Sequence, residues 1–220
     1  MPLNRFLNLP QEEKDRVLGI SKTQFAINGY DVTSLNLLLK ELDISKGQFY
    51  YWFEDKADLF FTVLQEGLDA LCLRLEEHGQ PTSAAGYWDH IRESRLLSER
   101  FWADHDFVEI GQMVSQQIPS NHPIYERLLV CSTPLQNHFI EGLRLGQEWG
   151  LVRTDLSVEI LLRLTDGVGD VFYGPILENY VKNRPLSEEI LSLHELLGRT
   201  IRLILQPVDT EDTSGLQNRP

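Results

Sequence analysis

The sequence has few residues that could crosslink the chain or anchor it in a membrane. Its 220 residues include two cysteines, Cys72 and Cys131, which lie far apart and in no paired spacing. Neither a disulfide framework nor a cysteine-based zinc site is therefore expected. The chain also lacks the roughly 18 consecutive apolar residues of a membrane-spanning helix, and its N-terminus lacks the apolar run of a signal peptide. We expect a cytoplasmic protein that does not enter a membrane.

Basic residues are also scarce, with 20 Lys and Arg against 33 Asp and Glu and a net charge of -13. Binding to nucleic-acid phosphates usually needs the opposite balance. The deficit is uneven, however, because residues 1–56 carry seven basic and eight acidic residues, while the remainder carries thirteen and twenty-five. The acidity therefore lies in the second part of the chain, as expected if only the first part contacts a polyanion.

Convincing strand patterns are absent too. Apolar residues recur with the helical period of 3.6, and no run alternates strictly with β-branched residues. We predict an all-α fold of about nine helices, divided into residues 1–56, residues 57–206 and a polar, disordered tail, 207–220. The expected helices span approximately 10–28, 34–42, 45–53, 55–79, 86–103, 104–118, 122–148, 156–182 and 187–206.

The stretch SKGQFYYWFEDK, residues 45–56, has an unusual helical pattern. A helix starting at Ser45 places three rings on one side, where they can join a core. The opposite side carries groups that can bond to base edges and phosphates. A short helix and a tight turn precede this segment, which predicts a helix-turn-helix with its second helix in the DNA major groove. The inward rings are Phe49, Trp52 and Phe53; the outward groups are Lys46, Gly47, Gln48 and Tyr51, with Tyr50 on the flank.

Residues 25–60, FAINGYDVTSLNLLLKELDISKGQFYYWFEDKADLF, closely resemble the N-terminal DNA-binding domain of the TetR family of transcriptional regulators. Asp43 stands where that family commonly has a turn glycine, and it reaches the left-handed conformation less easily. Leu39 replaces a small alanine. Only Arg5 precedes the first helix, so no basic arm in the minor groove is expected. The matching positions are Phe25, Ala26, Gly29, Tyr30, Thr33, Ser34, Leu35, Leu38, Ile44, Ser45, Lys46, Gly47, Tyr50, Tyr51, Phe53, Lys56 and Leu59.

The resemblance implies a DNA-binding domain and a C-terminal helical domain for effector binding and dimerisation. It further implies a homodimeric, ligand-responsive repressor that a small-molecule effector releases from a palindromic, double-stranded operator. An activator, or a protein-interaction module of the same fold, is the alternative. Three helix N-termini on one surface would also attract anions. The implied DNA-binding residues are Thr33, Ser34, Ser45, Lys46, Gly47, Gln48, Tyr50, Tyr51 and Lys56.

The acidic second domain offers candidates for an effector pocket and for a dimer interface. Pockets and cores use the same residue types, so the aromatic and polar residues of the middle helices fit either role. The effector candidates are Trp88, Phe101, Trp102, His105, Phe107, Met113, Tyr125, Phe139, Trp149 and Tyr173. The last helix, 187–206, is apolar on more than one face, and glycines in the segment 161–181 permit close helix approach. These features suggest a two-fold, four-helix interface made from these two helices of each protomer. The interface candidates are Leu161, Leu164, Val168, Phe172, Ile176, Ile190, Leu193, Leu197, Ile201 and Ile204.

Catalytic and metal-binding patterns are not evident. No nucleophile has a neighbouring base, and there is no phosphate-binding loop, so an enzyme is not expected. His105 and Glu109 have the spacing of metal ligands, but no second histidine accompanies them, and a charged helix start explains both residues. We expect no metal and no cofactor.

Overall fold

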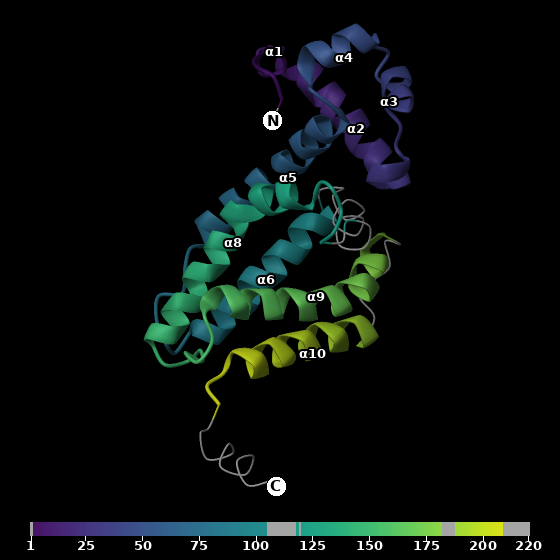
Figure 1. The fold of residues 1–220 in the computed structure, drawn as a ribbon. Helices are drawn as coiled ribbons and strands as arrows, with labels where there is room; N and C mark the ends of the chain where they lie inside the picture. Colours follow the sequence, from purple (N-terminus) through teal and green to yellow (C-terminus); the bar gives the residue numbers. More distant parts are fainter. Residues whose placement is uncertain (1, 105–117, 119, 182–187, 209–220) are drawn as a thin grey trace, which may run out of the picture.

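The computed structural model describes residues 2–104, 118, 120–181 and 188–208, and within them every regular element is a helix (Figure 1). This confirms the all-α prediction. The expected helix 104–118 and the tail 207–220 lie almost entirely outside the described residues. No helix in the described part is long and apolar enough to cross a membrane. The helices are α1 (Asn4–Leu7), α2 (Gln11–Val32), α3 (Leu35–Glu41), α4 (Lys46–Trp52), α5 (Lys56–His78), α6 (Tyr87–Asp104), α8 (Tyr125–Glu148), α9 (Val158–Val181) and α10 (Glu188–Leu205).

Polar caps start the short helices where the sequence places them. Ser34 Oγ accepts a hydrogen bond from Leu37 N, and Ser45 Oγ accepts one from Gln48 N, both at 3.1 Å. Asp55 caps α5 by accepting from Asp58 N at 2.6 Å. Each cap satisfies an N–H group that has no partner inside its helix. Asp43 does reach the left-handed conformation, with φ of 50°, so the helix-turn-helix turn forms without glycine.

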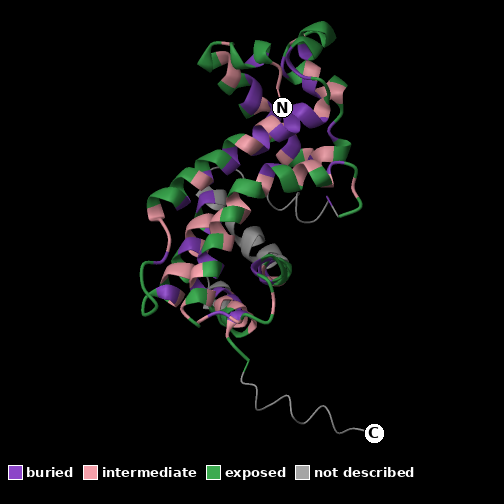
Figure 2. Cartoon of the chain, turned by 60° about the vertical axis from the view of Figure 1, so that its left-hand side comes forward, coloured by how far each residue is buried: buried purple, intermediate pink, exposed green. Residues whose placement is uncertain are grey.

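The N-terminal helices enclose an aromatic core. Phe25, Phe49, Phe53 and Phe60 are all fully buried, and their rings come from α2, α4, the residue after α4 and α5. Buried residues therefore concentrate at the centre of this domain, while its outer faces are exposed (Figure 2). Phe6 of the unpredicted helix α1 also packs here, with its ring centroid 4.7 Å from that of Phe53.

The second domain begins where α5 leaves this core. Helix α5 packs against α2 at one end and against α8 along its length, and α8 in turn packs against α9, which pairs with α10. The N-terminal core continues past residue 56 into α5 as far as Leu68 and includes Cys131 of α8. The two domains consequently share α5, and packing is continuous across the predicted division at residue 56.

Candidate nucleic-acid interface and effector cavity

Helix α4 separates its aromatic residues as the helical phase predicts. Phe49 and Trp52, like Phe53 just after the helix, are at most 3% exposed, whereas Tyr50 and Tyr51 are 46% and 53% exposed. Lys46, Gly47 and Gln48 are also exposed, in the first turn of the helix. The inward rings hold the helix on the core, and its opposite side exposes an ammonium group, an amide and two phenols to solvent.

Gly47 keeps the middle of this face open. A Cβ at this position would have no atom nearer than Ser45 Oγ, at 3.8 Å. The glycine is therefore not needed for packing within the chain. Its missing side chain instead lets another molecule approach the helix backbone closely.

The two candidates at the start of α3 have different environments. Ser34 is exposed and caps the helix, which leaves it at the surface. Thr33 is fully buried, and its hydroxyl donates to Gly29 O at 2.7 Å and lies 3.1 Å from Gln24 O. The prediction that Thr33 contacts phosphate with its side chain does not fit this geometry, because the hydroxyl already stabilises the end of α2.

Lys56 was also predicted to bind phosphate, but its ammonium group is engaged within the protein. Nζ donates to Tyr30 O at 2.6 Å and to Thr33 O at 2.9 Å, and it lies 4.3 Å from the centroid of the Tyr30 ring. Burial lowers the pKa of Lys56, while the nearby Asp31 opposes the shift. Lys56 thus ties the start of α5 to the end of α2, and a phosphate would have to compete with these carbonyls.

Arg5, for which no role was predicted, lies beside the exposed face of α4. Leu3 N donates to Trp52 O at 2.9 Å, which fixes α1 beside α4. The Arg5 guanidinium then lies 4.3 Å from the centroid of the exposed Tyr51 ring. Phe6, an apolar residue directly after Arg5, was the feature of the sequence that could have predicted this placement.

Polar contacts and ring contacts join the N-terminal domain to the helix α8 region. Arg127 of α8 donates to the buried carboxylate of Asp58 at 2.8 Å, and its guanidinium lies over the Phe61 ring at 4.7 Å. His122, just before α8, places Nε2 3.3 Å from Asp31 Oδ1 at the end of α2. A shift of α8 would therefore act on the starting turn of α5 and on the end of α2.

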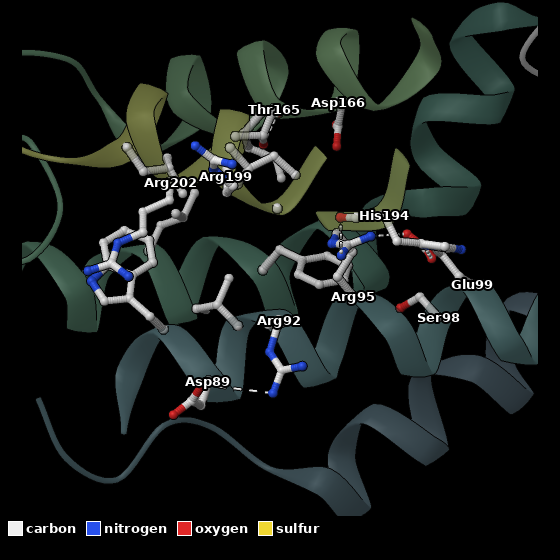
Figure 3. Close-up of a pocket in the computed structure, with 18 of the residues that line it drawn as sticks. Asp89, Arg92, Arg95, Ser98, Glu99, Thr165, Asp166, His194, Arg199 and Arg202 are labelled. Carbon is white, nitrogen blue, oxygen red and sulfur yellow. Dashed lines mark hydrogen bonds and ion pairs between the residues drawn. The ribbon is translucent and has the colours of Figure 1, made fainter. Parts of the chain in front are cut away.

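A cavity of about 670 Å³ lies in the second domain, between α6, α8, α9 and α10 (Figure 3). Its volume is typical of small-molecule sites. Of the predicted effector residues, Trp88 and Phe139 line it. Phe101, Tyr125 and Trp149 belong to cores instead. His105, Phe107 and Met113, and the side chains of Trp102 and Tyr173, lie outside the described residues.

Comparison with known proteins identifies the N-terminal helices. Residues 21–63, which contain α3, α4 and the start of α5, match the family described as bacterial regulatory proteins, tetR family. The N-terminal domain of this chain is therefore a TetR-family domain. The regulator QacR of Staphylococcus aureus is 41% identical over 51 residues, which are 23% of this chain and 27% of QacR. The match thus spans about a quarter of that relative and leaves the rest of it unmatched.

Solved structures resemble the fold of both domains. The fatty acid degradation regulator FadR from Bacillus halodurans has a TM-score of 0.67 at 16% identity, covering 89% of this chain and 97% of FadR. FadR from Bacillus subtilis, solved in complex with stearoyl-CoA, has a TM-score of 0.64 at 16% identity, covering 88% of this chain and 98% of that one. At such low identity these likenesses show a shared fold only.

Helices α9 and α10 expose an apolar face whose residues differ from most of those predicted for the interface. Leu161 and Leu197, both predicted interface residues, are fully buried. Leu161 packs in a core cluster with Tyr87 of α6 and Leu143 of α8. Leu164 is 45% exposed, as an interface residue would be. The other predicted residues are partly buried, except Ile176 and Ile190, whose side chains lie outside the described part. The exposed large apolar residues of the two helices are Ile160, Leu164, Val171, Leu196 and Leu203.

Proposed function

We propose that this protein is a homodimeric regulator that binds a palindromic operator through α4 and represses transcription until a small molecule enters the cavity. The observation that carries the proposal is the division of α4 into a buried aromatic side and an exposed polar side. A purely structural three-helix unit would need only the buried side. The exposed set of Lys46, Gly47, Gln48 and two tyrosines is suited to phosphates and base edges.

Selection of random DNA duplexes by the full-length protein tests this function. We expect enrichment of a palindrome whose half-sites are about 34–36 Å apart, one turn of DNA, because two α4 helices must enter successive major grooves. If low-salt selection enriches no sequence, the operator function is wrong and a protein-interaction module becomes the better hypothesis.

Effector release follows from the position of the cavity. Helix α8 lines the cavity with Leu135, Phe139 and Leu143 and carries Arg127 near its start. A ligand that prefers a different placement of α8 would alter the Arg127–Asp58 contact and hence the separation of the two α4 helices. Operator affinity can fall by no more than the ligand's preference between the two forms. The stearoyl-CoA complex of the B. subtilis neighbour supports a small-molecule effector in this fold.

The homodimer depends on the exposed apolar face of α9 and α10. Leu203 is 73% exposed, and a stable two-fold contact would cover it. We expect the wild type to run as a dimer in gel filtration with light scattering. Leu203→Asp should weaken dimerisation at least tenfold, on the order of the cost of burying an unpaired charge.

Leu73→Asp is the matched control, because Leu73 is 57% exposed on α5, outside this face. It should leave the dimer intact. A wild-type monomer at micromolar concentration, or equal dissociation by both substitutions, would show that α9 and α10 do not form the interface.

A further inference from the structure

The effector cavity is elongated. Helix α6 lines it from Trp88 to Glu99, eleven positions apart, which corresponds to about 16 Å of helix. Helix α10 lines the facing side from His194 to Leu205. Midway along α10, Gly198 faces Arg95, with no Cβ to narrow the space, and an added Cβ would still lie 3.7 Å from Arg95 Nη2. The cavity can therefore hold an extended molecule along α6.

The floor of the cavity is apolar. Leu135, Phe139 and Leu143 come from one face of α8, Leu162 from α9 and Ile201 from α10. A charged or strongly hydrated molecule would lose its water here without compensation. The middle of the ligand must therefore be apolar.

Charges at one end of the cavity compensate one another. Arg95 pairs with Glu99, and His194 Nδ1 lies 2.8 Å from Glu99 Oε2, although these two atoms are not aligned as a hydrogen bond. The three side chains are at most 11% exposed. This cluster joins α6 to α10, so Arg95 is already engaged within the protein and offers little charge to a ligand.

The other end of the cavity carries two arginines that, unlike Arg95, form no ion pair among the described residues. Arg199 and Arg202 of α10 line the cavity, and neither has a carboxylate within ion-pair distance among the described residues. The Arg202 guanidinium packs 5.0 Å from the centroid of the Trp88 ring, which fixes its place at this end. In Figure 3 both arginines extend from α10 on the side of the cavity away from Glu99 and His194.

Carboxylates also line the cavity and could neutralise its arginines. Asp89 is 80% exposed and lies 3.8 Å from Arg92, so these two charges largely offset each other in solvent. Asp166 and Glu195 are exposed residues, and Figure 3 places Asp166 away from Arg202, towards the His194 side. The Trp88 end thus retains the positive charge of Arg199 and Arg202, in a chain whose net charge is -13.

We infer that the effector is an elongated amphipathic anion, with its apolar chain along Phe139, Leu143 and Leu162 and its acidic group on Arg199 and Arg202. This inference rests on the proposed function only in naming the ligand an effector. A guanidinium pair binds carboxylate and phosphate alike through paired N–H donors. The chemical class is therefore a long-chain acid or its phosphate-bearing derivative.

Isothermal titration calorimetry of the full-length protein without DNA tests the class. The probes are dodecanoate, dodecan-1-ol and dodecyltrimethylammonium, which share a chain and differ in charge. Dodecanoate should bind about tenfold or more tightly than either of the others, the size expected for a charge-assisted hydrogen bond. Tighter binding of the cation would show that the carboxylates dominate, and binding of none of the three would overturn the inference.

Variants locate the acidic group. Arg199→Gln with Arg202→Gln, both at exposed positions, should weaken dodecanoate about tenfold and leave dodecan-1-ol unchanged. Arg74→Gln, at an exposed position on α5 outside the cavity, is the matched control and should change neither. Gly198→Leu should weaken both ligands by filling the cavity. An unchanged dodecanoate affinity in the double variant would place the acidic group elsewhere and sink the inference.

The outcome is separable from that of the proposed function, because calorimetry needs no operator. If the protein binds dodecanoate but selects no DNA sequence, the anion site is supported and the proposed regulatory function is wrong. A protein that binds an operator and is released by some other compound would remain a regulator with a different class of effector.

Discussion

Gln48→Ala should lower affinity for the selected operator by at least about thirtyfold and relax the preferred base at one position in each half-site. A bidentate amide-to-adenine contact contributes about 1–3 kcal/mol of discrimination, and a dimer loses two such contacts. The change should not disturb folding, because Gln48 is exposed and its backbone N–H, which bonds to Ser45 Oγ, remains. Fluorescence anisotropy with the operator and with single-base variants gives both quantities.

Gln11→Ala provides the control for this substitution. Gln11 is an exposed glutamine of the same domain, and its amide reaches only Asp15 on its own helix. Its removal should leave operator affinity within about twofold, as for a surface change with little effect on stability. Equal weakening of all sequences by Gln48→Ala, with no change in base preference, would place the base-contacting face elsewhere on α4.

Gly146→Ala should lower the free energy of unfolding by about 2–3 kcal/mol, because it overpacks the second domain. A Cβ here would lie 2.5 Å from Tyr87 Cζ and from Val152 Cγ2, and closer still to Tyr87 Oη. Tyr87 is fully buried and its ring contacts those of Trp88 and Trp149, so it has little room to move. Gly146 O also accepts from Leu151 N and Val152 N, which holds the backbone in place.

Thermal unfolding followed by circular dichroism measures the effect, and the midpoint should fall by roughly 5–10 °C. Gly19→Ala is the matched control, since Gly19 lies inside α2 with nothing within 4 Å of its added Cβ. It should raise stability by about 0.5–1 kcal/mol through the higher helix propensity of alanine. If both substitutions stabilise the protein alike, the close packing around Tyr87 is not rigid.

The sequence alone determined the helix-turn-helix. Its signals are local: Ser34, Ser45 and Asp55 each cap the helix that follows, and the phase of α4 separates Phe49 and Trp52 from Tyr50 and Tyr51. Caps and helical phase act within a few residues, so they can be read without knowing the fold. The family resemblance rested on the same short stretch.

Only the tertiary structure decided which residues line the cavity of the second domain and which form the exposed face of α9 and α10. Phe101 and Phe139 look alike in the sequence, yet one is core and the other lines the cavity, because neighbours distant in sequence surround each. The same holds for Leu161 and Leu164, which differ by less than one helical turn, and for Lys56, whose partners are carbonyls of α2 and of the turn after it. Burial and bonding at these sites depend on how helices pack, and no local pattern encodes that arrangement.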